Sequence, residues 1–78
     1  MSTTAEVFVG IDVAKATLDV AIRPTDRHWQ SANDEPSIAQ LVADLQALQP
    51  THIVLEATGG YEVPLVAALG AAGLPVAV

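Results

Sequence analysis

The sequence predicts an α/β fold in which a mixed five-stranded sheet carries two helices on one of its faces. Two apolar runs without alternation, at residues 7–11 and 53–55, predict buried strands, and two segments with apolar residues at helical spacing, 38–48 and 65–72, predict helices. The order strand, strand, strand, helix, strand, helix, strand combines a hairpin meander with two crossovers. Right-handed crossovers that advance in one direction give the strand order 3-2-1-4-5, with both helices on one face.

The first predicted strand has no polar face, because Val7, Phe8, Val9 and Ile11 follow one another with only a glycine between them. A strand of this kind is typical of a sheet centre that is covered on both sides. A short connection around Lys15 leads to residues 18–23, which alternate as a half-buried strand. Residues 27–32 predict a third, polar strand at the sheet edge, where Trp29 is interpreted as a packing residue.

Both helices have recognisable ends. The sequence Asn33-Asp34-Glu35-Pro36 offers capping side chains and a proline for a first turn, and Pro50 ends the periodic segment that follows. Thr58-Gly59-Gly60 predicts a tight turn before the second helix, which Gly73 closes. Residues 75–78 begin a further strand, and because the chain stops inside it, we expect the sequence to be the amino-terminal piece of a longer protein.

Composition limits the functions that the chain can have. It has no cysteine, which excludes thiol nucleophiles, disulfides and thiolate metal sites. No apolar run approaches a membrane span and the first residues do not form a signal peptide, so a cytoplasmic protein without a membrane partner is expected. The formal net charge of −6 repels nucleic acid phosphates. If the substrate is nucleic acid, most of the binding charge must lie elsewhere.

Two acids stand at the ends of the two apolar strands, Asp12 after the first and Glu56 after the second. If these strands are parallel neighbours, both acids lie at the carboxyl ends of strands at a topological switch point, where open sheets bind ligands. Neighbouring strands lie about 4.8 Å apart, so two carboxylates on one face can share a divalent cation. Asp19 falls on the polar side of its strand and is interpreted as a surface residue. His28 and His52 lack ligand spacing and are assigned to no metal.

The face of the sheet opposite the helices is expected to be apolar, since it carries alternate residues of the two apolar strands. No remaining segment of the chain can cover it. We therefore expect a later helix of the parent protein to lie there, and the isolated 78 residues to associate or partly unfold.

Three segments resemble a known family. They are Val9-Gly10-Ile11-Asp12-Val13-Ala14-Lys15, then Leu18-Asp19-Val20, and finally Leu55-Glu56-Ala57-Thr58-Gly59-Gly60-Tyr61-Glu62. In this order they resemble the opening of the DEDD transposases of bacterial insertion sequences, relatives of the Piv-type DNA invertases, over about residues 6–78. The resemblance implies a ribonuclease H-like fold of the RuvC type and four acids, Asp-Glu-Asp-Asp, that bind Mg²⁺. It makes Asp12 the first acid and Glu56 the second, both catalytic and metal-binding.

The remaining two aspartates of the family, and a carboxy-terminal domain with a catalytic serine, lie further along than Val78. We expect residues 1–5 to be a flexible leader, and the resemblance implies that residues 6–78 are an incomplete amino-terminal portion of a RuvC-like catalytic domain. It also implies metal-dependent DNA strand cleavage and transfer by the full-length protein, guided by an RNA that the element encodes. We expect that protein to be a homo-oligomer, and the 78-residue piece alone to be inactive.

Two other functional classes remain open at this point. An ATP-dependent kinase or ATPase of the actin and sugar-kinase type has the same strand order and a Gly-Ile-Asp opening, although its first hairpin usually carries a glycine and hydroxyls where this chain has Val13 to Thr17. Nucleotide binding distinguishes it from a transposase. A non-catalytic interaction module is the third class, and it would tolerate removal of both acids.

Overall fold

The structure is a computed structural model that describes residues 6–57 and 59–77. The leader predicted at residues 1–5 lies outside the described residues, as do Thr58 and Val78. The elements follow in the predicted order: β1 (Phe8–Val13), β2 (Thr17–Arg23), β3 (Arg27–Ala32), α1 (Glu35–Leu48), β4 (His52–Ala57), α2 (Val63–Ala71) and β5 (Val76–Ala77).

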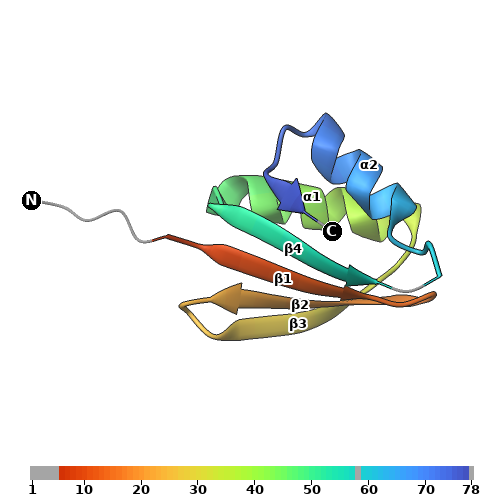
Figure 1. Cartoon of the computed structure of the whole chain (residues 1–78), viewed down its shortest axis with the longest axis horizontal. Helices are drawn as coiled ribbons and strands as arrows, with labels where there is room; N and C mark the ends of the chain where they lie inside the picture. Colours follow the sequence, from red (N-terminus) through yellow and green to blue (C-terminus); the bar gives the residue numbers. More distant parts are fainter. Residues whose placement is uncertain (1–5, 58, 78) are drawn as a thin grey trace, which may run out of the picture.

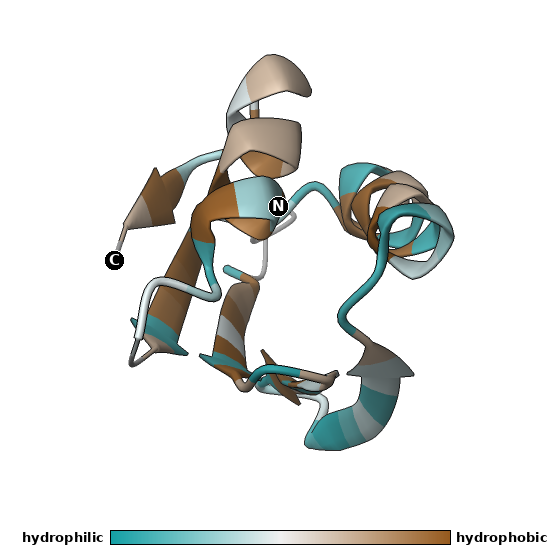
Figure 2. Ribbon diagram, turned by 90° about the vertical axis from the view of Figure 1, so that its right-hand side faces the viewer, coloured by the Kyte–Doolittle hydropathy of each residue, from teal (hydrophilic) through white to brown (hydrophobic). Residues whose placement is uncertain are grey.

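The five strands form one mixed sheet in the order β3-β2-β1-β4-β5, which confirms the predicted topology (Figure 1). The first three strands are a meander of antiparallel neighbours, whereas β4 is parallel to β1 and β5 is parallel to β4. Both helices lie on the same side of the sheet, as Figures 1 and 2 show. The fold is consistent with the ribonuclease H-like class that the sequence predicts.

The helix ends follow the residues that predicted them. The side chain of Asp34 caps α1 by accepting a 2.9 Å hydrogen bond from the backbone N–H of Ser37. At the other end Gln49 adopts a left-handed conformation, with φ of 53°, directly before Pro50. Gly73, with φ of 74°, follows the end of α2. A left-handed residue after a helix allows backbone N–H groups to bond the last free carbonyls.

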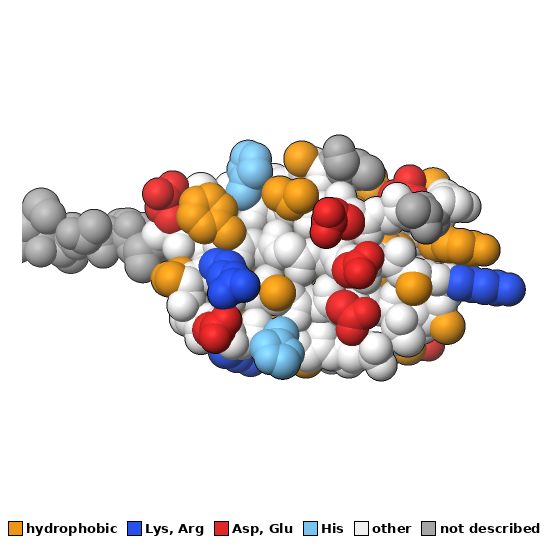
Figure 3. Space-filling model, turned by 60° about the horizontal axis from the view of Figure 1, so that its bottom comes forward, with side chains coloured by type: hydrophobic (Ala, Val, Ile, Leu, Met, Phe, Trp, Pro, Cys, Tyr) orange, Lys and Arg blue, Asp and Glu red, His pale blue; other side chains and the backbone are white. Residues whose placement is uncertain are grey.

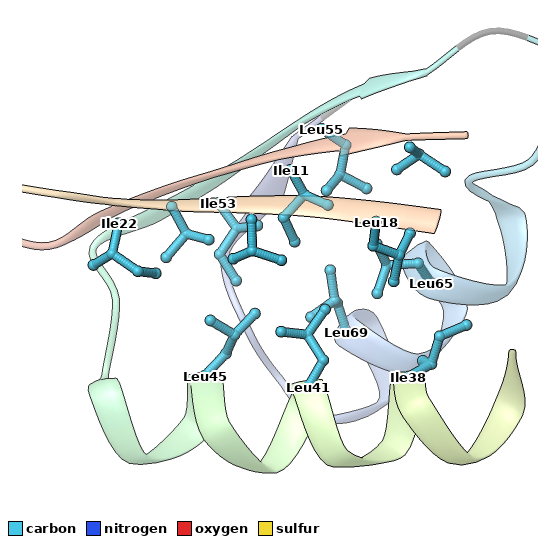
Figure 4. Close-up of a cluster of buried hydrophobic side chains, with 13 residues drawn as sticks. Ile11, Leu18, Ile22, Ile38, Leu41, Leu45, Ile53, Leu55, Leu65 and Leu69 are labelled. Atoms are coloured by element: carbon cyan, nitrogen blue, oxygen red, sulfur yellow. The ribbon is translucent and has the colours of Figure 1, made fainter. Parts of the chain in front are cut away.

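The core lies between the sheet and the two helices (Figure 4). It is aliphatic: Val9, Ile11, Val13, Leu18, Val20, Ile22, Ile53 and Leu55 from the strands, Ile38, Leu41 and Leu45 from α1, and Leu65 and Leu69 from α2. Trp29 on the edge strand packs against this cluster, as predicted. Sheet and helices are thereby held together by apolar burial, which contributes about 25 cal/mol per Å² removed from water.

Burial alternates strictly along the two strands that were predicted to be covered on both faces. In β1 the side chains of Val9, Ile11 and Val13 are buried, while Phe8 remains 45% exposed. In β4 Val54 is 46% exposed between two buried neighbours. Both helices pack on one side of the sheet, and within residues 6–57 and 59–77 nothing packs on the other, as expected for this piece of the chain. That a later helix of the parent protein covers the second face stays a prediction.

The uncovered face of the sheet is also less apolar than predicted. Phe8 and Val54 are its large exposed hydrophobic residues, but they share the face with Gly10, Asp12 and Glu56. The predicted association of the chain through this face remains a prediction. In the described part of the chain, no helix is long and apolar enough to cross a membrane.

Candidate functional site

Asp12 lies on the uncovered face of the sheet, near the carboxyl end of the central strand β1. Its orientation follows from the alternation of the strand: Ile11 and Val13 on either side are buried against the helices, so the carboxylate between them points to solvent. A strand-borne acid on this side avoids the cost of burying a charge in the aliphatic core.

Glu56 lies beside Asp12 on the same face. The parallel ladder between β1 and β4 aligns the two residues as direct register partners, and the next pair, Val13 and Ala57, is the last of the ladder. Glu56 is exposed, as Asp12 is, because Leu55 takes the buried position in β4. The predicted adjacency of the two acids at the carboxyl ends of neighbouring strands is therefore confirmed.

Asp19 extends the pair to a row of three acids. It lies opposite Asp12 in the antiparallel ladder between β1 and β2, and its carboxylate accepts a 3.1 Å hydrogen bond from the side-chain amide of Gln30 on β3. The row therefore runs across four strands as Glu56, Asp12, Asp19 and Gln30. Acidic side chains cross the middle of the face in Figure 3.

The sequence interpretation placed Asp19 on the surface but missed this alignment. The feature that could have predicted the alignment is the length of the turn between β1 and β2. The backbone N–H of Ala14 donates a 2.9 Å hydrogen bond to the carbonyl of Thr17, so the turn has two residues, Lys15 and Ala16. A two-residue turn fixes the register of a hairpin. Counting outward from it pairs residue 12 with residue 19.

Next to the acid row the face is hollowed over a volume of ≈ 510 Å³. Its lining combines small or short side chains with carboxylates, an amide and an imidazole; it includes Gly10, Ala21, Val54, His28, Gln30 and the three acids. His28, predicted to bind no metal, lies opposite Ala21 in the ladder, one row away from the acids. His52 lies opposite Phe8, two rows away from them.

The carboxylates of Asp12 and Glu56 have the chemistry of ligands for a hard divalent cation. Both are exposed, and within residues 6–57 and 59–77 no hydrogen bond to either carboxylate is seen. Among those same residues no group of three or more His, Cys, Asp or Glu side chains is arranged to hold a metal ion. Two carboxylates suit Mg²⁺, which keeps several waters and is completed by substrate phosphates.

Gly59 and Gly60 form the predicted turn after β4. Both have positive φ, 76° and 82°, and a Cβ at Gly59 would come within 3.1 Å of the Tyr61 ring. The glycines thus serve the sharp change of direction between β4 and α2, as the sequence indicated. Thr58, the first residue of the predicted turn, lies outside the described residues.

One family of known proteins matches most of the chain. The family model for DEDD transposases of the IS110 type, described as transposase, matches residues 9–78, which contain both strand-end acids and, apart from Phe8, every residue of the sheet. No curated protein matches the chain at a significant level.

Proposed function

Because the chain belongs to the family of IS110-type DEDD transposases, we propose that it forms part of the active site that cleaves and transfers DNA strands, with Asp12 and Glu56 as ligands of a magnesium ion. The observation that carries this proposal is the direct register pairing of the two acids on one open face of the sheet. Family membership also favours a transposase over an ATP-dependent kinase with the same strand order.

In this proposal the two acids share one task, which is to bind the magnesium ion. Each contributes carboxylate oxygens from a rigid central strand, and rigid strands keep ligands within the narrow tolerance that catalysis requires. A magnesium ion held there would stabilise the charge that develops on the attacking and leaving oxygens of the phosphodiester. The two carboxylates leave most of the octahedral shell to water and to the DNA phosphate.

The acidity of the chain fits a full-length protein in which other parts bind the DNA. With three basic residues against nine acids, this portion supplies little attraction for phosphates. We propose that residues 6–78 are the amino-terminal portion of a RuvC-like catalytic domain, and that two further aspartates complete the site. A guide RNA encoded by the element and other parts of a homo-oligomeric protein would then bind the DNA.

The test is a pair of substitutions in the full-length transposase, Asp12→Ala and Glu56→Ala. Each is expected to lower strand cleavage at least about a hundredfold, because a metal ligand is removed, while the thermal unfolding midpoint and RNA binding stay near those of the wild type. Asp44→Ala is the matched control, since Asp44 is an exposed acid on α1, whose buried face packs against the opposite side of the sheet. Full recombination by either site variant would overturn the assignment.

A further inference from the structure

Beyond the two acids, one residue links the segments that carry them. Asn33 lies between β3 and α1, in a connection that passes the carboxyl ends of β1 and β4 (Figure 1). Its side-chain amide donates one hydrogen bond to the carbonyl of Ala14, over 2.8 Å, and one to the carbonyl of Tyr61, over 3.3 Å. Ala14 follows Asp12 by two residues, and Tyr61 follows Glu56 by five.

These bonds bridge the place, called the fork below, where β1 and β4 stop pairing after Val13 and Ala57. The ladder between β1 and β4 ends at the pair Val13 and Ala57, one residue beyond the two acids. Beyond this pair β1 is followed by the hairpin to β2, whereas β4 is followed by α2, so the two segments separate. Asn33 bridges them just past this point, and its backbone N–H adds a third bond, to the carbonyl of Ala16 over 2.9 Å.

Asn33 is itself held in place. It directly precedes Asp34, the capping residue of α1, whose side chain is bonded to Ser37. The sequence suggested a capping role for Asn33, but the structure gives the cap to Asp34 and leaves the amide of Asn33 free to face the fork. An amide NH₂ has two donors and can serve two carbonyls at once, which neither an aspartate nor an aliphatic side chain can do.

We propose that Asn33 is a positioning residue for the cation site: by holding Ala14 and Tyr61 together, it limits how far β1 and β4 can separate at the end that carries Asp12 and Glu56. This inference rests on the proposed function, since it concerns the same cation. Groups that orient metal ligands typically change metal affinity by 10–100-fold when they are removed. The loss of Asn33 is therefore expected to appear in metal affinity before it appears in the maximal rate.

The experiment measures Mn²⁺ binding to the full-length transposase without DNA, by electron paramagnetic resonance, and cleavage as a function of Mg²⁺ concentration. Asn33→Leu, which keeps a similar shape without donors, and Asn33→Ala are expected to weaken Mn²⁺ binding about tenfold. The Mg²⁺ concentration for half-maximal cleavage should rise by the same factor, and saturating Mg²⁺ should restore most of the rate.

Gln46→Leu is the matched control. Gln46 also donates a side-chain amide bond to a backbone carbonyl, that of Ala72 over 3.5 Å, but it joins the two helices far from the fork. It is expected to lower the thermal midpoint measured in EDTA without altering Mn²⁺ affinity. Wild-type Mn²⁺ affinity in both Asn33 variants would overturn the inference.

Asp12→Ala, measured in parallel, separates this inference from the proposed function. If Asp12→Ala loses Mn²⁺ binding while the Asn33 variants keep it, the cation site stands and only the role of Asn33 is wrong. If Asp12→Ala binds Mn²⁺ as the wild type does, the cation site itself is wrong, and the role of Asn33 is wrong with it.

Discussion

Single residues in this chain act through a few well-defined contacts, and Asp34 at the start of α1 is the clearest. Hydrogen bonds from the Ser37 side chain, and next from its backbone N–H, lower the pKa of the Asp34 carboxyl below its ordinary value. A carboxyl whose pKa is lower in the folded state stabilises the fold above the unfolded-state pKa. That contribution is lost as the pH falls through the folded-state pKa.

Asp34→Ala is therefore expected to lower the thermal midpoint of the 78-residue chain by a few degrees at neutral pH, on the scale of a lost helix cap. The gap to the wild type should narrow as the pH falls below the ordinary pKa of an unfolded aspartate, about 3.9, and should close as the pH passes through the lower folded-state pKa, where the native carboxyl gains its proton. Asp34→Ser is the control, because a hydroxyl caps the helix without titrating. A gap between wild type and Asp34→Ala that stays constant down to pH 2 would contradict the role of the charged form.

At the scale of elements, β1 is unusual in having a glycine at the middle of a central strand. Gly10 does not have positive φ, and a Cβ added there would meet nothing within 4 Å. Neither the backbone conformation nor the described neighbours require a glycine. Glycine in a strand interior costs about 0.5–1 kcal/mol relative to alanine, because the unfolded chain has more conformations to lose.

Gly10→Ala is thus expected to raise the free energy of unfolding of the chain by about 0.5 kcal/mol, measured by denaturant titration. Gly60→Ala is the matched control, since a Cβ there also meets open space but φ is 82°. That variant is expected to lose about 1 kcal/mol, because a left-handed conformation is strained for alanine. Destabilisation by Gly10→Ala would mean that β1 requires a close backbone contact at this position.

The elements and their order could be predicted from the sequence because local signals agreed with the fold. Asp34 and Pro36 marked the start of α1, and Pro50 its end. What the apolar run from Val7 to Ile11 could not predict is the strict alternation of burial along β1, since such a run suits a strand buried on one side or both. Burial is decided by the helices that pack on the sheet, and these belong to other parts of the sequence.

The candidate site was predictable only in part for a related reason. Asp12 and Glu56 each end an apolar run, so their adjacency followed from the parallel pairing of two strands. Asp19 joins the row through hairpin register, which depends on the length of a turn. The side chain of Asn33 bonds to one residue that is 19 positions away in the sequence and to another that is 28 positions away. No local sequence pattern predicts contacts over such separations.

At the scale of the whole molecule, the row of acids is expected to lower the stability of the fold while it provides the ligands for a cation. Asp12 faces Glu56 on one side and Asp19 on the other, so two like-charge contacts converge on it in a chain whose net charge is already −6. Like charges directly opposite one another in a sheet are destabilising, by roughly 0.2–1 kcal/mol for each pair. A bound divalent cation would reverse the sign of this effect, because it is attracted to the same carboxylates.

Asp12→Asn is therefore expected to raise the free energy of unfolding of the 78-residue chain by about 0.5–1 kcal/mol in low salt without divalent cations. This gain in stability should shrink as added salt screens the charges of the row. Millimolar Mg²⁺ at constant ionic strength should stabilise the wild type, since a ligand that binds only the folded state adds to its stability, and should have little effect on Asp12→Asn. Asp44→Asn changes the net charge equally from the helical side of the molecule and serves as the control. Equal shifts in the two variants would mean that overall charge, and not the row, limits stability. A Mg²⁺ response retained by Asp12→Asn would mean that the cation binds elsewhere on the molecule.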